Sequence, residues 1–205
     1  MLPDDEPLNS TILHHGTEPL SQDERVILLQ LARKALVDAV QKRPLFTITV
    51  ENFSRRLQEN GASFVTLTIQ DNLRGCIGAL EAYQPLVEDV REHAVAAALN
   101  DYRFQPVKPE ELSVIRIEIS SLTPAERCEY NRTEDLLRII RPGIDGVIVK
   151  DGIRRATFLP QVWQKIPDPG IFFSMLCQKM GAPSNLWQRK KLEVFRYQVE
   201  EFHEE

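Results

Sequence analysis

The sequence has no apolar run long enough to cross a bilayer, no closely spaced cysteines and no excess of positive charge. A transmembrane helix needs about 18 or more consecutive apolar residues, so we expect no membrane-spanning helix. Residues 1–7 are acidic and lack the basic start and apolar stretch of a secretory signal. This absence predicts a cytoplasmic protein.

The charge balance argues against nucleic-acid binding. The net charge is -5, whereas nucleic-acid-binding surfaces gain affinity by neutralising phosphates with many Lys and Arg side chains. The basic clusters in this chain are short, and a pair such as Arg55 and Arg56 is typical of solvated surface. We therefore expect no nucleic-acid partner and no membrane association.

The chain contains three cysteines, Cys76, Cys128 and Cys177. They are too far apart in sequence for a short-spaced zinc or redox pair, or for an iron–sulfur cluster held within this chain. His14 and His15 are adjacent, but no third ligand is near them and they fall in a segment expected to be flexible. We therefore predict no metal site and no cofactor.

Composition and patterning predict a globular body behind a short leader. Apolar residues make up 42% and charged residues 27% of the chain, which is ordinary for a soluble domain with a substantial core. Residues 1–20 are expected to form a flexible leader and residues 21–205 the folded part. Motifs of phosphate loops, serine hydrolases and zinc proteases are absent from the sequence, so these chemistries have no motif support.

The folded part divides into two units that share a predicted order of hairpin, two helices and strand. The first unit, residues 21–125, begins with a helix over 21–42 that opens with a capping box at Ser21 and Glu24. A hairpin, a helix, a short helical turn and a strand then follow at 63–70 and 74–80, 85–99, 109–112 and 114–122. The second unit, residues 126–205, repeats this order with a hairpin at 146–150 and 153–159, helices at 160–165 and 168–180, and a strand at 192–202.

The repeated order predicts the fold class. Strands with alternating apolar residues and helices with one apolar stripe indicate an α+β fold, in which antiparallel sheets are flanked by helices. In the first helix, the predicted core stripe consists of Val26, Leu29, Ala32, Leu36 and Val40.

The segment from Leu73 to Gly78 carries the strongest candidate chemistry. Gly75 and Gly78 allow close approach of a ligand, and the Arg74 guanidinium can bind a carboxylate or phosphate through two hydrogen bonds. A cation near Cys76 would favour its nucleophilic thiolate. The structural alternative is that the cysteine is buried and that the glycines mark a bulge or tight helix packing. Strict alternation places Arg74 and Cys76 on one face of the strand and Gly75 on the other.

Other candidates are weaker. His93 is a candidate general base for Cys76, although such a histidine often marks only the edge of a helix face. Glu81 is a candidate for orienting a basic partner, or an ordinary solvated carboxylate. Asp101 and Arg103 are candidate ligand-binding residues that could also pair with each other.

The hexapeptide at residues 73–78 resembles the hallmark of the AmmeMemoRadiSam system protein A family, which shares its domain with the AMMECR proteins. Further segments in the family's order lie at residues 81–86, 94–98, 101–106, 141–146 and 156–163. The likeness covers about residues 21–203. Gln105 departs from the family pattern, in which proline is common, and this departure concerns only a local turn.

The resemblance implies a fold of two related parts with a cleft between them, and association with a Memo-type protein and a radical SAM enzyme. Our leading hypothesis is a small-molecule enzyme or binding protein. It would hold an anionic metabolite in a cleft beside Arg74 and use Cys76 as nucleophile or acid. The alternative is a non-catalytic adaptor that docks one of these two proteins.

Overall fold

The computed structural model describes residues 19–205. Only the last two residues of the leader expected over residues 1–20 are therefore described, and of these Leu20 is buried in the core. His14 and His15 lie outside the described residues. No helix within residues 19–205 combines the length and the apolar character needed to span a membrane.

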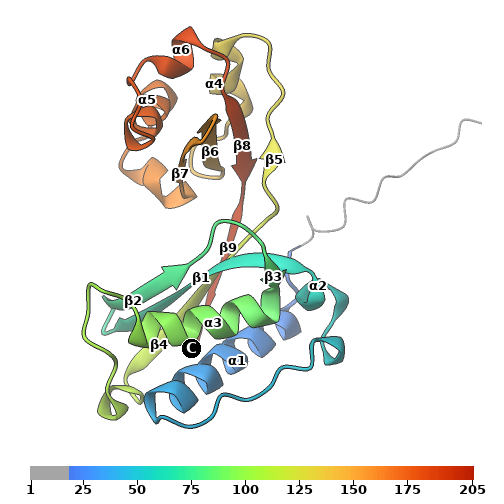
Figure 1. Cartoon of the computed structure of the whole chain (residues 1–205), viewed down its shortest axis with the longest axis vertical. Coiled ribbons are helices and arrows are strands. Elements are labelled where there is room, and N and C mark those ends of the chain that lie inside the picture. The colour runs from blue at the N-terminus through green and yellow to red at the C-terminus, as the bar shows by residue number, and fades with distance from the viewer. Residues whose placement is uncertain (1–18) are drawn as a thin grey trace, which may run out of the picture.

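The first lobe is a five-stranded antiparallel sheet with two long helices packed on one face (Figure 1). Four strands lie in the order β2 (Asn72–Gly78), β1 (Asn60–Ile69), β4 (Ile115–Leu122) and β9 (Val199–His203), and β3 (Gln84–Pro85) also pairs with β1. The two long helices are α1 (Gln22–Val40) and α3 (Leu86–Leu99). Shorter helices in the connections are η1 (Val50–Asn52), α2 (Arg55–Gln58) and η2 (Pro109–Glu111).

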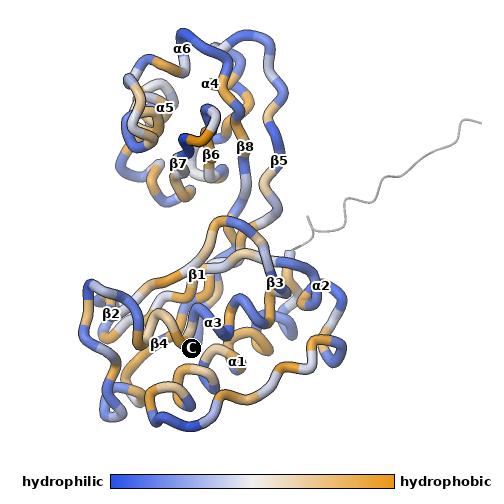
Figure 2. Tube along the Cα trace, in the orientation of Figure 1, coloured by the Kyte–Doolittle hydropathy of each residue, from blue (hydrophilic) through white to orange (hydrophobic). Residues whose placement is uncertain are grey.

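Helix α1 confirms the predicted capping box but not the whole predicted core stripe. The Ser21 hydroxyl accepts a hydrogen bond from the Glu24 amide at 3.3 Å, and the Glu24 carboxylate accepts one from the Ser21 amide at 2.8 Å. Val26 was expected to be buried but is 40% exposed, whereas Leu28 is fully buried. Figure 2 shows apolar and polar residues mixed along α1 and α3, as expected of helices with one buried face.

The second lobe is a four-stranded antiparallel sheet with short helices around it (Figure 1). Its strands, in spatial order, are β5 (Glu126–Arg127), β8 (Glu193–Tyr197), β6 (Gly146–Asp151) and β7 (Arg154–Phe158). Its helices are η3 (Thr133–Asp135), α4 (Leu136–Ile139), η4 (Pro160–Gln164), α5 (Pro169–Lys179) and α6 (Leu186–Arg189). The rings of Trp163 and Phe172 stack with their centres 3.6 Å apart in its core.

The predicted hairpin of the second lobe is confirmed. Strands β6 and β7 pair from Val147 with Phe158 to Asp151 with Arg154. Gly152 adopts a φ of +60° in the turn between them, a left-handed conformation that glycine tolerates better than other residues.

The two sheets share a strand order. In each sheet, the first strand of a hairpin also pairs with a later strand, and a fourth strand lies on the far side of that later strand. The order is β2-β1-β4-β9 in the first lobe and β7-β6-β8-β5 in the second. Because β5 follows β4 in the chain and β9 follows β8, two extended segments cross between the lobes (Figure 1). The Thr123 amide donates to the Gln198 carbonyl at 2.9 Å where they cross. We call these two connections, residues 123–125 and Gln198, the crossing ribbon.

The crossing ribbon divides the strand that was predicted over residues 192–202. Its first half, β8, belongs to the second sheet, and its second half, β9, pairs with β4 in the first sheet. The second unit expected over residues 126–205 therefore gives its last strand to the first lobe.

The lobes also meet through a small apolar cluster. Ala62 and Leu122 from the first sheet pack with Ile148 and Tyr197 from the second, and all four are buried. The molecule has the α+β fold that was predicted, with helices packed on antiparallel sheets.

Candidate functional site

Strand β2 departs from strict alternation at Arg74. Leu67 pairs with Gly75, and the next residue, Thr68, pairs with Leu73, so Arg74 is an extra residue in β2. Its guanidinium makes two hydrogen bonds to Glu111, from Nε at 2.7 Å and from Nη2 at 3.0 Å. These hydrogen bonds lower the pKa of the Glu111 carboxyl. The two-pronged carboxylate contact foreseen for Arg74 is therefore made within the chain.

The two glycines of the motif lie in close contact with neighbouring atoms. A Cβ atom on Gly75 would lie 2.2 Å from the backbone carbonyl oxygen of Ala97 in α3. A Cβ atom on Gly78 would lie 2.4 Å from the Phe64 ring and 2.4 Å from the Ser63 carbonyl oxygen. Both glycines therefore permit close packing within the first lobe.

Three of the predicted site residues, Cys76, Asp101 and Arg103, are in contact with one another. The Cys76 amide donates to Asp101 Oδ2 at 2.8 Å, and its carbonyl accepts from Arg103 Nη2 at 3.0 Å. Its Sγ atom lies 3.3 Å from Thr66 Oγ1. Because β2 is at one end of the sheet order, Asp101 and Arg103 occupy backbone groups that a neighbouring strand would otherwise pair with.

Asp101 and Arg103 also form a tight ion pair. Asp101 is 4% exposed and accepts hydrogen bonds from Arg103 Nε at 2.9 Å and Nη2 at 2.6 Å. These bonds hold the pKa of the Asp101 carboxyl well below its ordinary value and raise the pKa of Arg103. The pair covers the outer edge of β2, which is a structural role for two residues considered as ligand contacts.

His93 lies in a different polar cluster. Its Nδ1 atom is 3.1 Å from Asp89 Oδ2, and the same oxygen accepts a hydrogen bond from the Ser63 hydroxyl at 2.6 Å. All three residues are buried. The structure therefore places His93 against Asp89, whereas the polar contacts of Cys76 are with Thr66, Asp101 and Arg103.

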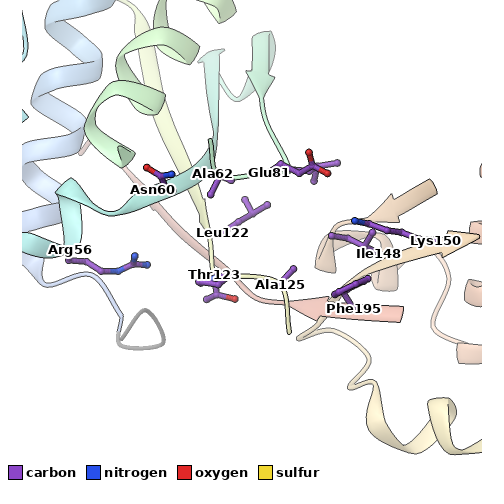
Figure 3. Close-up of a pocket in the computed structure, with 14 residues that line it drawn as sticks. Arg56, Asn60, Ala62, Glu81, Leu122, Thr123, Ala125, Ile148, Lys150 and Phe195 are labelled. Carbon is purple, nitrogen blue, oxygen red and sulfur yellow. The ribbon is translucent and has the colours of Figure 1, made fainter. Parts of the chain in front are cut away.

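A cleft of about 440 Å³ lies between the lobes (Figure 3). Of the predicted site residues, only Glu81 lines it. Glu81 forms an ion pair across the lobes with Arg155, and both side chains are 60% exposed. The cleft is therefore separate from the Arg74–Gly78 segment, where sequence analysis expected it.

Two cations line this cleft, one from each lobe. Arg56 in α2 has a side chain that is 20% exposed, and its Nε atom is buried without a hydrogen-bond partner within residues 19–205. Lys150 in β6 has its Nζ atom 5.1 Å from the centre of the Phe195 ring. Neither residue is predicted as a site residue from the sequence, in which the short Arg55-Arg56 pair is typical of solvated surface. No local signal distinguishes Arg56 from its neighbour Arg55, whose side chain is 79% exposed.

No group of three or more His, Cys, Asp or Glu residues within the described part of the chain is arranged to hold a metal ion.

Relatives of similar length are found among archaeal proteins. A protein from Methanothermobacter thermautotrophicus is 38% identical, with 91% of this chain and 97% of that protein covered. Protein MK0488 from Methanopyrus kandleri is 37% identical, with 92% of each chain covered. The crystal structure of the uncharacterised protein PH0010 from Pyrococcus horikoshii is 34% identical and superposes with a TM-score of 0.74, covering 87% of this chain and 90% of that one.

These comparisons place the chain in a class of α+β proteins shared among archaea. The family described as AMMECR1 matches residues 29–202, and the chain belongs to that family. The resemblance inferred from the hexapeptide and its companion segments is confirmed.

The three thiols are expected to differ in reactivity. Cys76 is partly exposed, whereas Cys128 and Cys177 are buried, and burial raises the pKa of both buried thiols. Because the thiolate is the reactive form, native alkylation with iodoacetamide should modify Cys76 at least about tenfold faster than the others. Peptide mass spectrometry over time measures the three rates, and the unfolded protein serves as control. Faster labelling of Cys128 or Cys177 in the native protein would contradict this assignment.

Proposed function

We propose that this protein binds a small anionic molecule with an apolar body in the cleft between its lobes. The observation that carries the proposal is the pair of cations, Arg56 and Lys150, that lines an otherwise largely apolar cleft. Side chains of Leu80, Leu122 and Phe195 are among those that form its apolar wall. Concave sites with apolar walls and a few polar groups are typical of small-molecule binding.

The hydrogen bonding of Arg56 favours an anionic ligand. Its Nη1 atom is 3.7 Å from Glu59, which also lies 3.7 Å from Arg55 Nε. The buried Nε donor has no acceptor within residues 19–205, and a buried unsatisfied donor costs about 1–3 kcal/mol. Because Arg56 lines the cleft and its contact with Glu59 is long, a ligand oxygen at the guanidinium would add a charge-assisted hydrogen bond.

The charge balance of the cleft also favours an anion. Lys150 has no carboxylate within 4.0 Å in the described part of the chain, and its ammonium lies over the Phe195 ring. The carboxylate of Glu81 is compensated by Arg155. The cleft therefore keeps an excess of positive charge that an acidic ligand can neutralise.

Anilinonaphthalenesulfonate (ANS), an anion with an apolar ring system, is a suitable probe of this cleft. Fluorescence titration of the native protein is expected to show saturable binding. Arg56→Gln and Lys150→Met should each weaken it about tenfold, because a hydrogen bond to a charged group contributes about 1.5–3 kcal/mol.

Two substitutions outside the cleft lining serve as matched controls. Arg55→Gln removes a neighbouring cation with the same 3.7 Å contact to Glu59, and Lys191→Met removes an ammonium 5.2 Å from the Tyr130 ring. Both variants should bind ANS as the unmodified protein does. Binding that is unchanged in both Arg56→Gln and Lys150→Met would rule out the cleft as the anion site.

A further inference from the structure

The two cations occupy different parts of the cleft. Arg56 belongs to α2 in the first lobe and Lys150 to β6 in the second. In Figure 3 they lie at opposite ends of the cleft, and the charged end of each side chain points toward the middle. Leu122 at the end of β4 and Thr123 of the crossing ribbon lie between them in this view.

Each cation is held at its own end. The Arg56 side chain is largely buried beside Glu59, and the Lys150 ammonium rests on the Phe195 ring. Moving either cation to meet the other would give up these contacts. A single acidic group at one end would therefore leave the other cation without a ligand partner: Lys150 has no carboxylate within 4.0 Å in the described residues, and Arg56 keeps only the 3.7 Å contact with Glu59.

We infer that the ligand of this cleft carries two acidic groups separated by an apolar spacer. This inference rests on the proposed function, since it names the class of anion that the same cleft takes. One acidic group pairs with Arg56 and the other with Lys150, while the spacer contacts the apolar wall that includes Leu122 and Ile148. A molecule of this kind compensates both charges at once, which a monoanion cannot do.

The two ends differ in the geometry of recognition. The guanidinium of Arg56 is a planar donor that suits a carboxylate or phosphate bound through two oxygens. The ammonium of Lys150 is a compact point charge that can donate hydrogen bonds to any acidic group within reach. The end at Arg56 therefore selects a planar carboxylate or a phosphate, and the end at Lys150 is less selective.

Calorimetric titration with straight-chain α,ω-dicarboxylates from hexanedioate to dodecanedioate tests the inference. Each diacid is compared with the monocarboxylate of the same carbon number. The best diacid is expected to bind about tenfold or more tightly than its monoacid, which corresponds to about 1.4 kcal/mol. Affinity should pass through a maximum at one chain length, because only one spacer length fits both cations.

Variants separate this inference from the proposed function. Arg56→Gln and Lys150→Met should each lower the affinity of the best diacid to that of the monoacid, whereas Arg55→Gln and Lys191→Met should leave it unchanged. Equal binding of diacid and monoacid, with ANS still dependent on both cations, would overturn the inference and leave the proposed function standing. Saturable ANS binding without binding of any diacid would have the same meaning. If the binding of ANS and of every diacid were unchanged in both Arg56→Gln and Lys150→Met, the proposed function and this inference would both be overturned.

Discussion

Replacing Gly75 with alanine is expected to destabilise the protein by about 3 kcal/mol, or to prevent it from folding. The added methyl group would lie 2.2 Å from the carbonyl oxygen of Ala97. That oxygen belongs to the backbone of α3, so relief requires a shift of the helix away from β2 and cannot come from rotation of a side chain. The free energy of unfolding, measured by urea titration with circular dichroism, gives the size of the effect.

Gly152→Ala provides the matched control. Gly152 has a φ of +60°, and a Cβ atom there would meet no atom within 4 Å. The same substitution therefore costs only the left-handed backbone conformation, about 1–2 kcal/mol. A Gly75→Ala protein that is as stable as Gly152→Ala would show that α3 can move away from β2 at little cost. The motif glycine would then need an explanation other than packing.

The order of elements could be predicted from sequence because its signals are local. The capping box at Ser21 and Glu24 marks the start of α1, and the turn at Gly152 marks the second hairpin. The division of the last strand could not be predicted in this way. Phe195, Tyr197 and Val199 alternate across the junction of β8 and β9 with no proline or glycine between them. Long-range pairing with β6 or β4 decides which sheet each half joins.

The candidate site could be predicted from the sequence only in part. Cys76, Asp101 and Arg103 are candidates from the sequence, and the structure brings them together at the edge of β2. The carboxylate partner of Arg74 could not be predicted, because Glu111 is 37 residues away in the sequence.

The cations of the cleft show the limit more clearly. Arg55 and Arg56 are the same residue type in the same short helix, yet only Arg56 lines the cleft. Lys150 comes from the other lobe, about 90 residues farther along the chain. Whether both side chains face the same cleft depends on how the crossing ribbon joins the lobes, and no local sequence pattern encodes that arrangement.

Replacing Asp101 with asparagine is expected to cost about 2 kcal/mol of stability near neutral pH. The carboxylate accepts hydrogen bonds from the Cys76 amide and from the Arg103 amide and guanidinium. A neutral amide loses the charge that strengthens these bonds and turns one acceptor into a donor. Arg103 is partly exposed, so water compensates it in part, and the expected loss is below that for a fully buried ion pair.

The dependence on pH identifies the charge as the cause. The pKa of the Asp101 carboxyl is lowered in the folded protein, so this group contributes its full stabilisation above the unfolded-state value of about 3.9 and loses it as the pH falls below that value. The difference in unfolding free energy between the unmodified protein and Asp101→Asn should therefore be largest near pH 7 and narrow toward about pH 3. Asp151→Asn is the control. The side chains of Lys190 and Arg154 lower the pKa of this carboxyl too, but Asp101 also accepts hydrogen bonds from two backbone amides, so a smaller effect is expected at Asp151. A difference at Asp101 that stays constant with pH would mean that the loss comes from altered packing at the edge of β2 and that the carboxylate charge does not hold that edge.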